Sequence, residues 1–311
     1  MSVLDVVAAR EAAVKQPVTP SRKSTHVVSY SELDSIRQCR LKAHLAYKER
    51  WQPETISPAL SRGKLFHSVL EAHYSALATT LGSSGVDQTV GPWDVLDAAE
   101  DCEETDTVKW IYKGYLDLYG EDKQWEVLAV EERVEEWLML PNGRRSTFKL
   151  KGVVDLLVRD HSAGGGLWVV DHKTCRELPK QRALDFDDQM GIYTLLLRRA
   201  GYDIRGVIYN ACRSYKLKRP MSPDERFKRH LTTRTEHELE VMAQEALTTF
   251  KTAYGVGQRG KVGGALPPRS PDPDRCGWRC PFTEACLMGR KGSDIRALLS
   301  ETGFTQNFNR H

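Results

Sequence analysis

Two short apolar runs, each interrupted by a single aspartate, constrain the fold of this chain more than any other feature. They occupy residues 152–157 and 168–174, and both have the composition of buried strands. Side chains alternate faces along a strand, so Asp171 and Lys173 point the same way. If the runs pair as a hairpin across the short turn between them, Asp155 reaches the same patch.

Two carboxylates and one ammonium group at a sheet edge suit a hard divalent cation and an attacking water. The alternative is a surface ion pair among solvated charges, which contributes little stability. Both aspartates interrupt runs of Val, Leu and Trp, where an unpaired charge is costly. The pattern therefore favours a functional site over a surface ion pair.

The composition is that of an ordinary globular protein, because 40% of the 311 residues are hydrophobic and 28% are charged. This length can bury a core as one large domain or two small ones. A net charge of +3 is compatible with a polyanionic partner. The sequence shows neither a secretory signal nor an apolar run near the ~18 residues of a membrane helix. We therefore expect a cytoplasmic protein with no membrane partner.

The distribution of the cysteines says more than their number. Seven cysteines, an odd count, argue against a disulfide framework in an intracellular protein. Cys276, Cys280 and Cys286 lie close together, and the other four are scattered. Three thiolates predict a site that needs a fourth ligand, either tetrahedral zinc or an iron–sulfur cluster. Unligated buried thiols are the alternative, which this close spacing disfavours.

The amino-terminal part of the chain is predicted to be helical after a weakly tethered arm. Residues 1–24 form the arm, and a capping box at residues 29–32 starts a helix that runs towards Tyr47. Pro58 opens a second helix with a period of 3.6 residues. A third helix is expected over residues 93–119.

From residue 125 the pattern changes to strands. Two runs flank a Pro-Asn-Gly turn at residues 141–143, which predicts a hairpin, and a third strand covers residues 167–173. This order predicts an α/β fold in which a three-strand meander, a crossover helix and a fourth, parallel strand form one mixed sheet flanked by helices. The crossover helix, the fourth strand, a basic loop, a further helix and a Gly/Pro linker are expected at residues 185–201, 204–209, 213–230, 235–254 and 255–273.

Two pairs of helical residues can be attached to the carboxylate site. Gly63 and His67 lie one turn apart on the same face, so the helix could approach the sheet closely and present His67 to a metal. Gln189 and Tyr193 share a face of the crossover helix. Taken alone, each pair also fits ordinary helix polarity.

In this order the motifs resemble the PD-(D/E)XK nuclease superfamily, specifically its RecB-like branch with a carboxy-terminal iron–sulfur cluster. That branch includes CRISPR-associated exonucleases and phage-type recombination exonucleases. The resemblance covers about residues 25–290 and implies a restriction-endonuclease-like core. It rests on six pieces, which are residues 29–33 leading to Cys39, 63–67, 152–155, 171–173, 189–193 and the terminal cysteines.

The resemblance implies a site for Mg²⁺ or Mn²⁺. Asp155 and Asp171 would bind the metal, and the backbone carbonyl of His172 and the side chain of His67 would complete the ligand set. Asp171 occupies a position at which the family has Asp or Glu. Hydrolysis of a phosphodiester places negative charge on oxygens that such a cation can stabilise.

Three further residues have roles that the resemblance implies. Lys173 would orient or activate the hydrolytic water and stabilise charge on the scissile phosphate. Gln189 and Tyr193 would position the DNA strand or buttress the lysine. The sequence leaves open which of Glu131 and Glu132 points at the site.

The resemblance also implies a structural 4Fe-4S cluster held by Cys39, Cys276, Cys280 and Cys286. Cys39 stands at the end of the first predicted helix, where the family has its fourth ligand. Ligation would join the amino-terminal and carboxy-terminal segments of the chain. Zinc remains the alternative, because four thiolates suit either metal.

DNA contacts are expected from basic residues outside the carboxylate site. Residues 213–230 are rich in Lys and Arg and include Tyr215 and Phe227, so this segment could grip phosphates and stack on bases. A solvated loop is the alternative. The predicted DNA-binding residues are Arg62, Lys64, Arg213, Lys216, Lys218 and Arg219.

One nuclease domain over residues 25–290 follows from these inferences, with a carboxy-terminal tail after it. Its predicted parts are a helical part, a catalytic sheet core, and a helix with an iron–sulfur knuckle, at residues 25–120, 125–215 and 235–290. The tail comprises residues 291–311.

The predicted function is a Mg²⁺- or Mn²⁺-dependent DNA exonuclease that acts at DNA ends in recombination, repair or replication. Its partners would be linear single- or double-stranded DNA and a recombinase or single-strand-binding protein, in a cell or an infected bacterial host. The alternatives are a catalytically silent DNA-binding or scaffold protein on the same fold and a structural-zinc protein. The polarity, the strand preference and the oligomeric state are left open.

Overall fold

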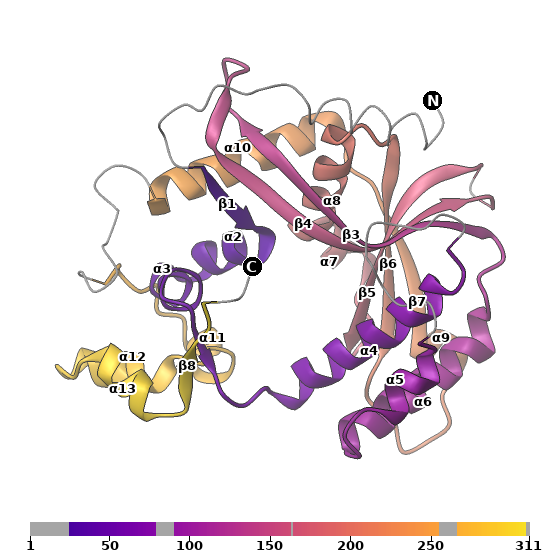
Figure 1. The fold of residues 1–311 in the computed structure, drawn as a ribbon, viewed down its shortest axis with the longest axis horizontal. Helices are drawn as coiled ribbons and strands as arrows, with labels where there is room; N and C mark the ends of the chain where they lie inside the picture. Colours follow the sequence, from indigo (N-terminus) through magenta and orange to yellow (C-terminus); the bar gives the residue numbers. More distant parts are fainter. Residues whose placement is uncertain (1–24, 79–89, 163, 255–265, 309–311) are drawn as a thin grey trace. The chain divides into compact units, whose positions relative to one another are not determined.

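The computed structural model describes residues 25–78, 90–162, 164–254 and 266–308 (Figure 1). The predicted arm, residues 1–24, lies outside the described residues, as does the first part of the predicted linker, residues 255–265. None of the described helices has the length and apolar character that a membrane span requires.

The chain divides into two compact units. Unit 1 comprises residues 58–243 with the residues before 28, and unit 2 comprises residues 28–57 and 244–311. Strand β1 (His26–Ser29) is the segment at which the chain first passes from unit 1 to unit 2. The predicted nuclease domain, residues 25–290, stays a prediction.

Unit 1 is built on a mixed sheet in which β3, β4, β5, β6 and β7 are neighbours in that order. The β5–β6 pair is parallel, whereas the other three pairs are antiparallel. The predicted meander, crossover and fourth parallel strand are therefore confirmed. The strands are β3 (Trp125–Met139), β4 (Arg145–Asp160), β5 (Gly166–Cys175), β6 (Ile204–Arg213) and β7 (Phe227–Thr232).

The β3–β4 hairpin follows from its turn. Gly143 has a φ of 74°, a conformation that favours glycine, and its amide donates to the carbonyl of Leu140 at 2.9 Å. The register then places Gly152 opposite Val134. The turn thus fixes which residues of β4 lie beside β3.

Helices flank this sheet. Within unit 1 they are α4 (Pro58–Ser75), α5 (Pro92–Asp97), α6 (Glu103–Tyr119), α7 (Gln181–Asp185), α8 (Asp188–Arg199) and α9 (Pro223–Arg226). Helix α8 lies against β3, β4 and β6. Helix α10 (Glu236–Tyr254) begins in unit 1 and ends in unit 2.

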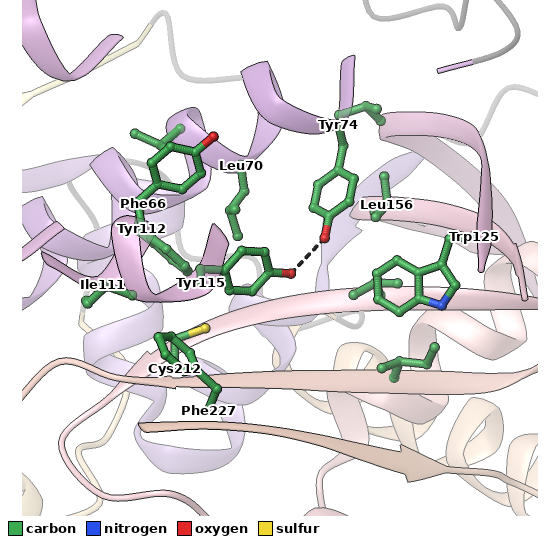
Figure 2. Packing of buried hydrophobic residues seen from close by; sticks show 14 of the residues in the cluster. Phe66, Leu70, Tyr74, Ile111, Tyr112, Tyr115, Trp125, Leu156, Cys212 and Phe227 are labelled. Carbon is green, nitrogen blue, oxygen red and sulfur yellow. Dashed lines mark hydrogen bonds between the residues drawn. The ribbon is translucent and has the colours of Figure 1, made fainter. Parts of the chain in front are cut away.

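The core of unit 1 packs α4 and α6 onto the sheet. Phe66 and Leu70 of α4 lie in one buried cluster with Ile111 and Tyr115 of α6 and Leu156 of β4 (Figure 2). Burying each such side chain contributes about 1.5–3 kcal/mol. The cluster therefore holds α4 against the central strands, and α4 is the helix that carries His67, a metal ligand according to the resemblance.

Two details of the predicted fold of unit 1 are wrong. The single helix expected over residues 93–119 is two helices, α5 and α6, separated by an extended residue, Cys102, with φ −152° and ψ 171°. The loop expected over residues 213–230 contains α9 and most of β7. Among the described strands β7 pairs only with β6, and an exposed lysine such as Lys228 is typical of an edge strand. In the sequence, the basic residues of this strand resemble those of the loop before it, so residues 227–230 are predicted to be part of a loop.

Unit 2 has a small core of its own around Leu41, Leu45, Phe282 and Leu299. A two-stranded antiparallel sheet of β2 and β8 also belongs to it. The amide of Glu32 donates to Ser29 Oγ at 3.2 Å, as expected for the predicted capping residue. The elements are α2 (Tyr30–Gln38), α3 (Arg40–Ala43), the π-helix η1 (His44–Lys48), β2 (Trp51–Pro53), α11 (Pro273–Trp278), α12 (Thr283–Arg290), α13 (Ile295–Glu301) and β8 (Phe304–Gln306).

Two parts of unit 2 differ from expectation. The first helix does not run unbroken to Tyr47, because Cys39 is extended with φ −163° and ψ 117°. Residues 291–308, expected as a tail, carry α13 and β8. Two interactions hold this segment in unit 2. Leu299 of α13 lies in the small core, and the buried carboxylate of Glu49 accepts hydrogen bonds from Arg296 of α13 at 2.5, 2.9 and 3.0 Å.

Two glycine substitutions test how closely helices approach the sheet. A Cβ at Gly152 would lie 3.0 Å from Leu196 Cδ1 and 3.2 Å from Tyr193 Cε1, so Gly152→Ala is expected to destabilise the protein by about 1–3 kcal/mol. A Cβ at Gly63 would lie 3.7 Å from Thr174 Oγ1, which is ordinary contact. Gly63→Ala is therefore expected to stabilise α4 by up to about 1 kcal/mol.

Urea unfolding followed by circular dichroism compares the two variants with wild type. The order of midpoints should be Gly63→Ala, wild type, Gly152→Ala, from most to least stable. A Gly63→Ala protein less stable than wild type would show instead that α4 needs a glycine to approach the sheet.

Candidate active site

The carboxylate of Asp155 in β4 lies between a helix and the neighbouring strand. Its Oδ2 accepts a hydrogen bond from the backbone amide of His172 in β5 at 2.7 Å. Its Oδ1 lies 3.4 Å from Nδ1 of His67 in α4. The hairpin and α4 thus bring together two of the residues to which the resemblance assigns metal binding.

Glu131 of β3 adds a second carboxylate. The register pairs Val130 with Leu156 and Glu132 with Val154, so Glu131 lies opposite Asp155. Glu131 has a φ of 50°, a left-handed conformation that is unusual for a residue other than glycine.

One ligand atom from each of three residues, His67, Glu131 and Asp155, lies within 4.8 Å of the others. Among the described residues this is the group of His, Cys, Asp and Glu side chains that could hold a metal ion. The sequence left open which of Glu131 and Glu132 points at the site, and the structure brings Glu131 there. A positive φ at one residue of a strand leaves no signal in the sequence.

Asp171 and Lys173 of β5 form a close ion pair on the same face. Lys173 Nζ lies 2.8 Å from Oδ1 and 2.7 Å from Oδ2 of Asp171, and the aspartate is fully buried. The carboxylate of Asp171 therefore faces the ammonium group and is not a member of the three-residue group. The shared face of Asp171 and Lys173 is as strand alternation requires.

Gln189 and Tyr193 of α8 are joined to each other next to this ion pair. Gln189 Nε2 donates to the Tyr193 hydroxyl at 2.7 Å. Burial raises the pKa of Tyr193, and the charge of Asp171 acts in the same direction. The charge of Lys173 opposes this shift, so both members of the ion pair act electrostatically on the phenol of α8.

The side chain of His172 points away from the carboxylates into a polar network. Asn210 Nδ2 lies 2.8 Å from His172 Nδ1 and donates to the Tyr115 hydroxyl at 3.0 Å. The ring of His172 stacks on Tyr74, with centroids 5.6 Å apart and planes at 11°. Burial lowers the pKa of His172 to about 3, so its imidazole is neutral. The ring of His172 is thus engaged by Asn210 and Tyr74, whereas its backbone amide contacts Asp155.

A buried ion pair closes this network. Arg229 donates two hydrogen bonds to Asp122, at 2.6 and 2.7 Å, and Tyr74 donates a third at 2.6 Å. A buried charge pair is tolerated only when its remaining polar atoms are also satisfied. Sequence reasoning missed these residues. Their only signal is a polar side chain at a buried strand position, such as Asn210.

Ionisation at the site follows from burial and from these partners. Burial raises the pKa of Glu131 to about 7, and the charge of Asp155 adds to the effect. Burial opposes ionisation of Asp155, but the hydrogen bond and charge of His67 prevail and lower its pKa to about 2. The same interaction raises the pKa of His67 although burial would lower it.

The buried ion pair is charged at neutral pH. Burial raises the pKa of Asp171 to about 6, against the effect of Lys173. Burial alone would lower the pKa of Lys173, but the charges of Asp171 and Asp155 raise it well above its usual range. A fixed ammonium group therefore stands beside the carboxylates.

The predicted DNA-binding residues are dispersed. Lys64 is exposed and Arg62 half-buried on α4, and Lys218 is exposed. Lys216 Nζ lies 5.2 Å from the centre of the Trp110 ring. Two intramolecular hydrogen bonds, at 3.0 and 2.5 Å, join Arg219 to the Glu225 carboxylate. Arg213, half-buried, ends β6.

The four cysteines implied as ligands line one pocket in unit 2, with a volume of about 290 Å³. The Ser270 amide donates to Cys39 Sγ at 3.4 Å, and the Asp272 amide donates to Cys276 Sγ at 3.5 Å. Cys39 lies at the break between α2 and α3. Lys42 and four arginines also line the pocket, which places positive charge around the thiols. The cysteines in question are Cys39, Cys276, Cys280 and Cys286.

Comparison with known proteins gives one assignment. No curated protein matches the chain. The crystal structure of SSO0001 matches with a TM-score of 0.39 and 15% identity, covering 91% of this chain and 94% of that one. At this level of similarity it adds nothing to the assignment. The model of the PD-(D/E)XK nuclease superfamily matches residues 27–287, which is most of the chain. The protein therefore belongs to the PD-(D/E)XK nuclease superfamily.

Proposed function

We propose that this protein is a metal-dependent exonuclease that hydrolyses phosphodiester bonds at DNA ends. Membership of the superfamily indicates a metal-dependent nuclease that acts on DNA. The observation that carries the proposal is the convergence of His67, Glu131 and Asp155 within 4.8 Å. The ammonium group of Lys173, whose charge acts on the pKa of both Asp155 and His67, belongs to the same site.

The donor set fits a divalent cation such as Mg²⁺ or Mn²⁺, because carboxylate oxygens and one imidazole suit these ions. His67, Glu131 and Asp155 would hold it, and Asp171 with the His172 carbonyl would complete the ligand set. A bound cation supplies charge stabilisation at the phosphate and lowers the pKa of a bound water. Asp155 is ionised and ready for this role because His67 keeps its pKa low.

Lys173 acts through its charge. Its raised pKa excludes it as a general base at neutral pH, since the amine does not lose its proton there. Held by Asp171 and adjacent to the α8 tyrosine, the ammonium group can donate to a nonbridging phosphate oxygen. It thereby stabilises the charge that develops in the transition state.

The choice of an exonuclease over other nucleases rests on the resemblance to the RecB-like branch. A role in recombination, repair or replication, with a recombinase or single-strand-binding protein as partner, is proposed on the same ground. A catalytically silent DNA-binding protein is less favoured, because Asp155, Asp171 and Lys173 are all in place.

Lys173→Ala and Asp171→Ala are each expected to reduce cleavage of linear DNA by about 10²-fold or more. The first removes the ammonium group beside the phosphate, and the second removes the carboxylate that holds this group and is a proposed metal ligand. The assay compares strands labelled at the 5′ or the 3′ end with closed circles of the same sequence, in Mg²⁺ and in Mn²⁺. Wild type should degrade the linear strands and spare the circles.

Lys149→Ala is the matched control. This lysine of β4 lies 2.7 Å from Glu135 in an ion pair that contains none of the proposed site residues. It should retain activity. Cleavage of circles by wild type would contradict an exonuclease, and wild-type rates in Lys173→Ala would contradict the site itself.

Metal affinity is expected to rise as the pH rises through about 7, because a cation must displace the proton that Glu131 binds below its raised pKa. His67, whose pKa is also raised, acts in the same direction. Glu131→Gln should weaken Mn²⁺ binding at pH 8 and reduce the number of protons released. Isothermal titration calorimetry in buffers of different ionisation enthalpy measures both quantities.

The contribution of His67 is common to wild type and variant, so the difference between them reports Glu131. Glu132→Gln, one residue along β3, is the control and should retain the affinity of wild type. Equal affinities in wild type and Glu131→Gln at pH 8 would exclude Glu131 as a ligand.

For the cysteines we propose a structural 4Fe-4S cluster in unit 2. All four thiols line one pocket, and two of them accept amide hydrogen bonds of the kind that stabilise cluster sulfurs. A tetrahedral zinc site with bonds of 2.3 Å would bring its sulfurs within about 3.8 Å of each other. Among the described residues no three of these cysteine sulfurs lie within 4.8 Å of one another, so the choice of a 4Fe-4S cluster over zinc rests on the resemblance.

Cys280→Ser is expected to lower iron and acid-labile sulfide content and the melting temperature, because one of four cluster ligands is lost. Cys102→Ser, in unit 1, is the control and should match wild type. Metal analysis and thermal unfolding provide the readouts. Stoichiometric zinc without iron in the wild-type protein would support the structural-zinc alternative instead.

A further inference from the structure

Phe186, between α7 and α8, is 80% exposed, the highest value for a large apolar side chain among the described residues of unit 1. Single exposed apolar residues are common and require no explanation by themselves. This one differs because hydrogen bonds hold the backbone that carries it, and because that backbone leads directly into the cap of α8, the helix of Gln189 and Tyr193.

A buried arginine fixes the backbone on both sides of Phe186. The guanidinium of Arg234, 9% exposed, donates to the carbonyls of Leu184 and Asp185 at 2.9 Å each and to the carbonyl of Asp187 at 3.3 Å. Hydrogen bonds to a charged donor are among the stronger ones in proteins. The exposure of the ring is therefore a property of a braced segment.

The helix before Phe186 is anchored as well. Gln181 of α7 donates to the carbonyl of Leu231 in β7 at 3.1 Å, and its Oε1 lies 3.0 Å from Nδ1 of His230. Leu184, 3% exposed, packs into the interior. Both the helix and the residues that follow it are thus tied to the sheet.

The residue after Phe186 belongs to the surroundings of the catalytic lysine. Asp187 caps α8 by accepting from the amide of Gln189 at 2.9 Å, and Gln189 contacts Tyr193. Burial raises the pKa of Asp187, while the Gln189 amide and the charge of Lys173 oppose the shift. Asp187 thus joins the backbone that carries Phe186 to Gln189 and, through Gln189, to Tyr193, the two residues proposed to position the DNA strand or buttress the lysine.

We propose that Phe186 is a stacking platform for one unpaired nucleobase next to the scissile phosphate. A rigid aromatic ring that projects into solvent beside a phosphate-binding site presents the surface on which a base stacks, whatever its identity. Bases inside a duplex are already stacked, so the platform selects single strands or frayed ends. This inference rests on the proposed nuclease function and adds a substrate class to it.

The test measures DNA affinity in a Lys173→Ala background with Mg²⁺, in which cleavage is suppressed. Phe186→Ala should weaken binding of a single strand on the order of tenfold, whereas Phe186→Trp should retain binding. Phe186→Leu, which keeps apolar bulk but not the ring, should resemble Phe186→Ala. Leu118→Ala, which removes an exposed apolar side chain from α6, is the control and should bind as the parent does.

Abasic substitution locates the contact. A single abasic nucleotide moved along the strand should weaken binding to the parent protein at one position near the cleaved end. On the strand that is abasic at that position, Phe186→Ala should cause no further loss of affinity, because the interacting base and the ring act as a pair. Unchanged melting temperatures in all variants are expected for so exposed a side chain.

Three results would overturn the platform. The first is equal affinity of the parent and Phe186→Ala for a single strand. The second is that the losses of affinity from Phe186→Ala and from the abasic nucleotide add up at every abasic position. The third is a Phe186→Ala protein with unchanged DNA affinity that loses self-association or a protein partner, which would make Phe186 a protein contact. In each case end-dependent cleavage by wild type would still support the proposed nuclease function. An inactive wild type would contradict both the nuclease function and the stacking role of Phe186.

Discussion

The antiparallel pairing of β4 with β5 is the constraint on which the rest of the site depends. Its register, with Leu156 opposite Val170, lets the amide of His172 donate to Asp155 at 2.7 Å. A slip of one residue would turn every side chain of one strand to the other face. Because β5 also carries Asp171 and Lys173, this hairpin brings three of the proposed site residues together, and α4 and β3 add His67 and Glu131.

Burial of so many charges is possible because most are paired. Asp171 is held by Lys173 and Asp155 by His67, so each carboxylate has a nearby cationic or hydrogen-bonding partner. Glu131 differs, since burial raises its pKa to about 7 and the strongest charge acting on it, that of Asp155, adds to the effect. The site therefore concentrates negative charge at one place, and a divalent cation would offset it.

In unit 2 the position of the Cys39 thiol depends on the fold of the surrounding chain. The amino-terminal capping residue and the helix after it are visible in the sequence, but the break at Cys39 is not. That break puts the thiol at the same pocket as three cysteines from the other end of the chain. Likewise, α13 is held by Leu299 in the small core and by the pairing of Arg296 with Glu49, a carboxylate distant in sequence.

The alternation of apolar residues and aspartates is enough to predict the β4–β5 hairpin, because strand periodicity is local. The order of helices and strands along the chain predicts the mixed sheet around it. It also predicts that Lys173 shares a face with its aspartate. The left-handed Glu131, the contact of Asn210 with the histidine behind the site, and the bracing of Phe186 by Arg234 lie beyond such patterns. Each depends on a backbone conformation or on contacts between residues far apart in the chain, which only the folded molecule brings into existence.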